Sequence, residues 1–301
     1  MYDLIAANKR NSWVLILLMS GLVVALGVSI GAAAAQSPYG GLVIALGVAV
    51  VMFLISWYGG GDLIMMVSGA RKIAHGDNPQ LDNVVEEMSI AAGIPKPEIY
   101  IIDDTAPNAF ATGRDPNHAA VAITTGLLQK LDRDELQGVM AHEMSHVRNF
   151  DIRYAMLMAV MVGTIALIAD FFLRITFYGR GSRRRSSEGR GGGGAQAILF
   201  LIAIVLAILA PIVGKIIQLA MSRQREFLAD ASAAELTRYP EGLARALEKI
   251  AKDPEPLEAA NRATQHLYIV NPLKKAPGTR SSIWSTHPAI ENRIARLRAM
   301  T

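Results

Sequence analysis

The sequence predicts a mainly α-helical integral membrane protein, with four hydrophobic transmembrane helices and a cytoplasmic α+β domain that contains a small sheet. Hydrophobic residues make up 51% of the 301 positions and charged residues only 19%, which is apolar for a soluble protein of this size. Four segments approach or exceed the ~20 apolar residues that cross a bilayer core. Short strand-like and helical patterns fill the stretch between the second and third segments.

The four apolar segments set the expected domain boundaries. They run from Trp13 to Ala35, from Tyr39 to Tyr58, from Tyr154 to Tyr178 and from Ala195 to Ile217. We therefore expect an N-terminal transmembrane hairpin (1–58), a cytoplasmic region (59–153), a second hydrophobic hairpin (154–217) with a Gly/Arg-rich loop (179–194), and a second cytoplasmic region (218–301). The loop contains five arginines. Short basic loops usually lie on the cytoplasmic side, whereas four full crossings would place this loop on the outer side. Whether the second pair of segments crosses the membrane fully is therefore left open.

Charges near the N-terminus predict the orientation in the membrane. Lys9 and Arg10 precede the first segment, which places the N-terminus in the cytoplasm, and two crossings return the chain there. A cleaved signal peptide is the alternative, but the apolar run is longer than a usual signal core and a second span follows almost at once. Much of the net charge of +4 lies in local arginine clusters, which favours contact with a lipid bilayer and no nucleic-acid partner.

The region between the hairpins alternates helices and strands. Patterns predict a helix over 83–92, stopped by a glycine and a proline, and strands over 98–102 and 118–123. A short segment over 108–113 ends at a glycine, and a short helix is expected over 124–131. Asp132 followed by Glu135 makes an Asp-type capping box, which predicts the start of another helix.

That last helix carries the most informative motif of the chain. His142 and His146 lie one turn apart on one helical face, so both imidazoles can bind one metal ion. Glu143 lies beside the first histidine and can take a proton from a metal-bound water. This is the H-E-x-x-H pattern of zinc metalloproteases. The chain has no cysteine, so any metal site must use histidines and carboxylates.

A third metal ligand must come from another part of the chain, because catalytic zinc needs three protein ligands and one open position. The fourth apolar segment continues without proline or glycine into a helix on which Glu226 and Asp230 share one face. Glu226 is our candidate ligand, with Asp230 accepting a hydrogen bond from a ligand histidine, an arrangement similar to that of gluzincin proteases. Taken alone, the two acids could instead face solvent beside neighbouring arginines.

Several segments together resemble the HtpX family of bacterial membrane-bound heat-shock zinc proteases and, more distantly, the prenyl-protein (CAAX) metalloproteases. The matching segments are 108–113, 136–149, 225–230, 285–288 and 290–297, and the four apolar segments occur in the family's order. The resemblance implies a zincin-like (gluzincin) domain with one zinc ion per chain and a multi-pass protein of the bacterial inner membrane, whose active site faces the cytoplasm. It also implies an endopeptidase of stress response and quality control, acting on damaged membrane proteins and unfolded polypeptides, with other quality-control proteases as candidate partners.

The same resemblance suggests further site residues, each with a plainer alternative. His287 matches the family's Thr-His-Pro segment and could stabilise the oxyanion, or it could be a buried structural histidine. Arg293 could support the site or face solvent on a final amphipathic helix. Residues Asn108, Ala109, Phe110 and Ala111 resemble the family's substrate-pairing edge strand, although a plain loop is the alternative. The remaining histidines, which lack a ligand partner at useful spacing, are interpreted as surface or structural residues: His75, His118 and His266.

A rival function class is a non-catalytic membrane scaffold or chaperone that retains a structural metal site. Structural zinc sites usually have four protein ligands, whereas this sequence offers three and an acid at the base position, which favours catalysis. Few ionisable residues lie within the apolar segments, which disfavours a transporter. Seven residues separate His146 from the third apolar segment, so at ~1.5 Å per helical residue the site should lie within about 15 Å of the membrane surface.

Overall fold

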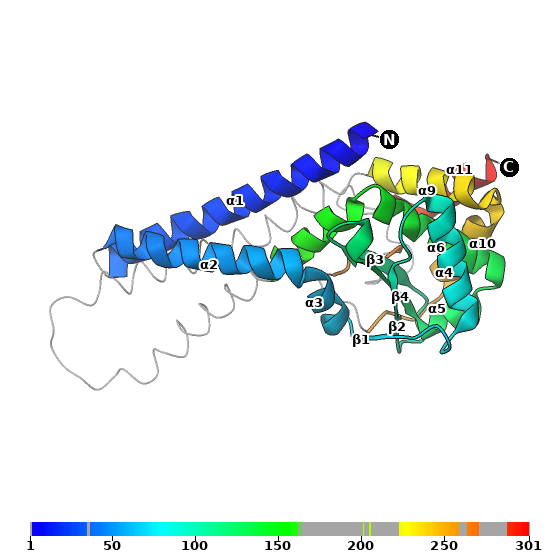
Figure 1. Ribbon diagram of the computed structural model, residues 1–301. Helices are drawn as coiled ribbons and strands as arrows, with labels where there is room; N and C mark the ends of the chain where they lie inside the picture. The colour runs from blue at the N-terminus through cyan, green and yellow to red at the C-terminus, as the bar shows by residue number, and fades with distance from the viewer. Residues whose placement is uncertain are drawn as a thin grey trace.

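Two long helices project from a domain built of helices and one small sheet (Figure 1). The computed structural model describes residues 2–34, 37–161, 163, 201, 205, 223–258, 264–270 and 288–300. Helix α1 spans Tyr2–Ala34 and helix α2 spans Pro38–Tyr58. Helix α1 therefore begins well before the predicted start at Trp13, and its first turns lie beside the domain rather than beyond it.

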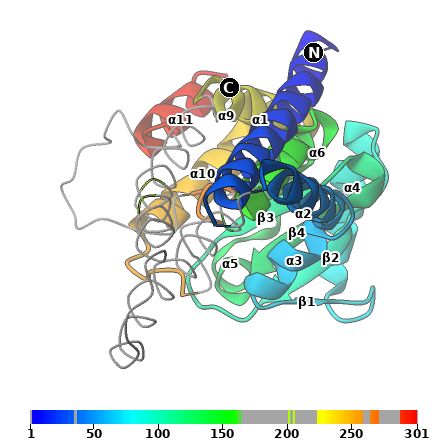
Figure 2. The same cartoon turned by 90° about the vertical axis from the view of Figure 1, so that its left-hand side faces the viewer.

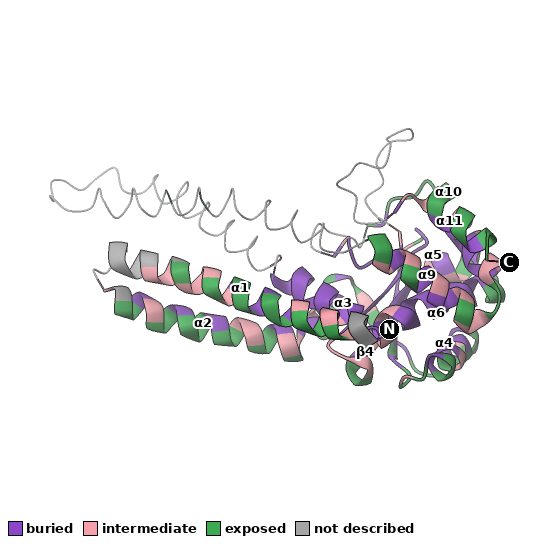
Figure 3. Ribbon diagram, turned by 90° about the horizontal axis from the view of Figure 1, so that it is seen from above, coloured by how far each residue is buried: buried purple, intermediate pink, exposed green. Residues whose placement is uncertain are grey.

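The two projecting helices form a close antiparallel hairpin. A Cβ built on Gly27 of α1 would lie 2.2 Å from the Cβ of Ala45 of α2, so the absence of a side chain allows this approach. Nearer the domain, Trp13 and Trp57 stack with ring centroids 5.5 Å apart. Apolar side chains along the hairpin are exposed, among them Leu17 at 70% and Val43 at 70%, and Figure 3 shows this exposure along both helices. A bilayer would cover such a surface.

The structure tests only part of the prediction of four membrane spans. Of the described residues, one helical stretch, Tyr39–Tyr58, is long and apolar enough to cross a membrane. Most of the third and fourth predicted segments lies outside the described residues. The described start of the third segment, 154–161, is helical and buried in the protein core. The four-span arrangement therefore stays a prediction.

The sheet has four strands in the order β1-β2-β4-β3. Their bounds are Ala70–Lys72 for β1, Glu98–Ile102 for β2, Ala109–Gly113 for β3 and Ala119–Thr124 for β4. Strands β2 and β4 are parallel, and the other two pairs are antiparallel. The strand predictions at 98–102 and 118–123 are confirmed to within one residue. The segment at 108–113 forms edge strand β3, so the plain-loop alternative is wrong.

Helices cover both faces of the sheet. Helix α4 (Pro79–Ala92), the motif helix α6 (Arg133–Arg148) and the C-terminal helices contribute to one apolar core. Helices α1 and α3 (Gly60–Val67) and residues 154–161 contribute to a second core, which includes Phe110 of β3. Figure 2 shows α1 and α2 projecting from the side of the molecule that bears α3. Helix α3, strand β1 and helix α10 (Pro240–Lys252) were not predicted.

The motif helix α6 is fixed at its start and along its length. Asp132 and Glu135 form the predicted capping box, which satisfies backbone N–H groups at the helix start. Gly138 faces helix α10 so closely that an added Cβ would lie 2.6 Å from the backbone nitrogen of Leu243. The short helix α5 (Thr125–Lys130) precedes α6, as predicted. Helix α6 is thus positioned between the sheet, α4 and α10, and its buried side presents the motif.

Candidate active site

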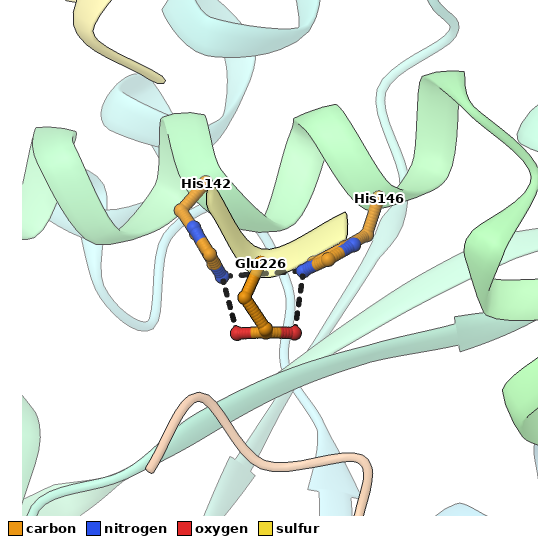
Figure 4. A group of neighbouring side chains, drawn as sticks. All are labelled: His142, His146 and Glu226. Atoms are coloured by element: carbon orange, nitrogen blue, oxygen red, sulfur yellow. Dashed lines mark hydrogen bonds and ion pairs between the residues drawn. The ribbon is translucent and has the colours of Figure 1, made fainter. Parts of the chain in front are cut away.

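Two helices bring the three candidate metal ligands together. Helix α6 presents His142 and His146 one turn apart, and helix α9 (Arg223–Thr237) presents Glu226 opposite them (Figure 4). The two Nε2 atoms lie 3.2 Å apart. Glu226 Oε2 lies 3.8 Å from Nε2 of His142, and Oε1 lies 3.6 Å from Nε2 of His146. All three side chains therefore converge on one point.

This donor set fits a tetrahedral divalent cation. Zinc bonds of about 2.0–2.1 Å in a tetrahedron separate neighbouring ligand atoms by about 3.3 Å, close to the separations seen here. The Nδ1–H of His142 donates to Asp230 Oδ1 at 3.0 Å, and that of His146 donates to Asp151 Oδ2 at 3.1 Å. With both protons on Nδ1, the two Nε2 lone pairs face each other, an arrangement that a cation between them stabilises.

Glu143 lies beside the ligands without joining them. Its side chain lines a cavity of about 20 Å³ together with Ala111, His146 and Glu226, a space that holds roughly one water molecule. Burial raises the pKa of Glu143 to about 7, and the charge of Glu226 also raises it, although the backbone N–H of Ala111 acts in the opposite direction. A carboxyl group with a pKa near neutrality can both accept and donate a proton.

Asp230 is held from the other side by a buried arginine. Arg293 of helix α11 (Ile290–Arg298) donates from Nε and Nη2 to the two carboxylate oxygens of Asp230, at 2.8 and 2.7 Å. Its Nη1 lies 3.3 Å from Glu226 Oε2. Arg293 is 1% exposed, so the solvent-facing alternative is wrong. Burial raises the pKa of Asp230, but Arg293 and His142 outweigh it and lower the pKa overall.

The structure places three residues at the site that the sequence analysis did not assign to it. Asp151 orients His146, and Asn8 of α1 donates to Asp151. His266 is buried, lines the same cavity as Glu143, and its Nε2 lies 3.1 Å from the carbonyl oxygen of Ala155. Spacing in the sequence gave no signal for Asn8 or His266. Asp151 lies close to the motif in the sequence, but the sequence did not predict the turn that directs its side chain back to His146.

The other predicted residues have different outcomes. His75 and His118 are exposed, and each pairs with a nearby aspartate, as expected for surface histidines. His287 lies outside the described residues. Edge strand β3 runs beside α6, and Ala111 faces Glu143. On the same strand, the carbonyl of Ala109 already accepts a hydrogen bond from the N–H of Ile269 at 3.0 Å.

Comparisons with known proteins identify the family of the chain. Residues 75–301 match peptidase family M48. The chain is 47% identical to a protease HtpX homolog of Dictyoglomus thermophilum over 99% of this chain and 94% of that protein. It is 42% identical to one of Lactobacillus helveticus over the full length of both. The crystal structure of S. mikatae Ste24p shares the fold with a TM-score of 0.51 at 21% identity, over 99% of this chain and 67% of that one. The chain therefore belongs to peptidase family M48, among the HtpX homologues, and is a membrane metalloprotease.

Proposed function

We propose that the protein is a zinc-dependent endopeptidase of the bacterial cytoplasmic membrane, which hydrolyses peptide bonds in damaged or misfolded membrane proteins. The observation that carries the proposal is the convergence of His142, His146 and Glu226 beside the buried acid Glu143. Of the described residues, three form the ligand cluster, which leaves a position open for water or substrate and disfavours a purely structural metal site.

The residues around the cluster suggest how a peptide bond would be cut. A zinc ion bound by His142, His146 and Glu226 would polarise water and the scissile carbonyl. Glu143 accepts a proton from the water as the water oxygen bonds to the carbonyl carbon. Glu143 then delivers that proton to the amine nitrogen as the C–N bond breaks. Asp230 and Asp151 hold the two imidazoles in the tautomer that a metal requires.

We further propose that substrate lies along the free edge of strand β3. An extended peptide can add to a sheet edge through backbone hydrogen bonds, and Ala111 brings that edge next to Glu143. The bond between Ile269 and Ala109 occupies the preceding part of the edge. Of the predicted segment Asn108–Ala111, we therefore assign substrate pairing to Ala111 and the residues that follow it in β3.

We also propose that the site faces the cytoplasm close to the membrane surface. Helix α6 leads within a few residues into 154–161, which packs against α1 near Leu15 and Ile16. Arg153 lies over the ring of Trp57, at the domain end of α2, with 5.1 Å between the guanidinium carbon and the ring centroid. Short loops and tails of membrane proteins would therefore reach the site more readily than distant soluble segments.

The test uses the full chain purified in detergent, with unfolded casein as substrate. Wild type should cleave casein and bind one zinc ion per chain. Glu143→Gln should keep the zinc and lose cleavage, because the ligands remain and the proton acceptor does not. Glu226→Gln should lose zinc, whereas Glu235→Gln, at an exposed position of the same helix, should behave as wild type. Equal cleavage by wild type and Glu143→Gln would reject the mechanism, and full zinc retention by Glu226→Gln would reject that ligand.

A further inference from the structure

The first turns of helix α1 reach the metal site through a buried amide. Asn8 is 3% exposed, although it lies on the helix that continues into the first apolar segment. Its Nδ2 donates to Asp151 Oδ1 at 2.6 Å and to the carbonyl oxygen of Asn149 at 2.9 Å. Both amide protons of Asn8 are therefore used, and both go to residues just beyond the motif helix.

Asp151 is the link between that amide and the metal ligands. It is 5% exposed, and its Oδ2 accepts the Nδ1–H of His146 at 3.1 Å. Its other oxygen, Oδ1, accepts from Asn8 and lies 3.6 Å from Nη1 of Arg225. Because each oxygen of Asp151 has its own partner, Asn8 restricts the rotation of the carboxylate that orients His146.

The backbone between the motif helix and Asp151 is held in an unusual conformation. Phe150 has a φ of 61°, in the left-handed region that a residue with a bulky side chain rarely adopts. Such a conformation persists only when surrounding contacts maintain it. Helix α1 supplies two of these contacts: Asn8 bonds the carbonyl of Asn149, and Nζ of Lys9 lies 4.2 Å from the centroid of the Phe150 ring. This turn directs Asp151 back towards His146.

We propose that Asn8 and Asp151 are positioning residues of the metal site, so that the N-terminal helix α1 is itself part of the structure that orients His146. The inference rests on the proposed function, since it concerns the same zinc ligands. Asp151 acts directly on His146, and Asn8 acts through Asp151 and the turn at Phe150. The protease domain therefore has its complete metal site only while the first turns of α1 are docked against it.

The experiment measures zinc affinity of the full-length protein in detergent, by competition with a chromogenic chelator. Asp151→Ala should raise the zinc Kd by about 10–100-fold, the range for a residue that orients a metal-binding histidine. Asn8→Leu should raise it less, by about threefold or more, because its effect passes through Asp151. Asn11→Leu is the matched control and should leave the Kd unchanged, since the side chain of this half-buried asparagine, on the same helix, makes no hydrogen bond within the described residues.

Zinc affinity separates positioning from a merely structural role. A contact that only stabilises the fold lowers the thermal midpoint equally with and without zinc and leaves the Kd unchanged. Adding Asn8→Leu to Asp151→Ala should cause no further loss of affinity, because both act along one path. If Asn8→Leu does not yield folded protein, Asn8→Ser replaces it.

The outcomes also distinguish this inference from the proposed function. A wild-type Kd in the Asn8 variant, with a wild type that binds zinc and cleaves casein, overturns the inference alone. Independent, additive losses in the double variant overturn the path through Asp151. A wild-type protein that binds no zinc overturns the proposed function and this inference together.

Discussion

Replacing Arg293 with methionine should destabilise the protein strongly, because it leaves buried carboxylates without their cation. Arg293 and Asp230 are each 1% exposed and share two hydrogen bonds of 2.8 and 2.7 Å. Nη1 of Arg293 also donates to the carbonyl oxygen of Ile269 at 2.9 Å. Methionine fills a similar volume but supplies neither the charge nor the donors, so the lost interaction is electrostatic rather than a cavity.

The size of the effect follows from the burial. Removing one partner of a buried ion pair costs about 3–5 kcal/mol, since the other charge stays in the interior without compensation. At about 2–4 °C of thermal midpoint per kcal/mol for a domain of this size, Arg293→Met should lower the midpoint by roughly 6–20 °C. The thermal midpoint of Arg293→Lys should lie between those of wild type and Arg293→Met, because lysine keeps the charge but cannot make the bidentate pair with Asp230.

Thermal unfolding in detergent, with the metal removed by a chelator, measures this effect without the contribution of zinc. Arg298→Met is the matched control on the same helix, where the side chain is 43% exposed and pairs with Glu241 and Glu248 at the surface, and it should leave the midpoint close to that of wild type. Adding Asp230→Asn to Arg293→Met should recover part of the loss. A midpoint of Arg293→Met within about 2 °C of wild type would refute the reasoning.

Three further predictions test the packing, the acid sensitivity and the orientation. Gly138→Ala should lower the thermal midpoint although alanine favours helices, because its Cβ would meet the backbone of Leu243; an unchanged midpoint would contradict that contact. Burial raises the pKa of Asp82, but hydrogen bonds from Lys96 and a neighbouring histidine outweigh it and lower the pKa below 3.8. Its stabilisation is present above pH 3.8 and lost as the pH falls below it, so Asp82→Asn should lose less stability than wild type on acidification, followed by tryptophan fluorescence. The chain has no cysteine of its own, so Asn117→Cys introduces a single one. That cysteine should react with a membrane-impermeant maleimide in inverted vesicles and not in intact cells. The reverse pattern would place the domain outside the cell.

Local patterns were enough to predict several elements of this fold. The capping box at Asp132 and the alternation at Glu98–Ile102 depend on neighbours within one helical turn or strand, and both were confirmed. Strand β1 was not predicted, because three residues, Ala70–Lys72, carry too little pattern and depend on pairing with β2. Helix α10 was missed although its local signal was present: it begins at Pro240, and Leu243, Leu247 and Ile250 recur at helical spacing.

The site shows the same division between local and distant information. His142 and His146 are linked by helical spacing, and Glu226 with Asp230 by the same spacing on another helix, so each pair could be proposed separately. Arg293 was suggested only by the family resemblance, because an arginine on an amphipathic helix normally faces solvent, and its burial results from the packing of α11 on α9. The approach of α1 to the site joins residues more than a hundred positions apart, which no periodic pattern can reveal.

The charges at the centre explain why a divalent cation suits this interior. Four buried or nearly buried carboxylates surround the histidines, and two guanidinium groups lie against them: Glu143, Asp151, Glu226 and Asp230, with Arg225 and Arg293. Among the described residues, with these six groups ionised and both histidines neutral as metal ligands, the formal charge is −2, and burying uncompensated charge is costly. A divalent cation balances this excess, whereas a monovalent cation leaves one charge without compensation. Proton transfer from water to Glu143 during hydrolysis moves a charge between two groups of the same centre, so the total charge stays balanced throughout the step. The same electrostatic balance therefore connects metal binding to the proposed proton-transfer step.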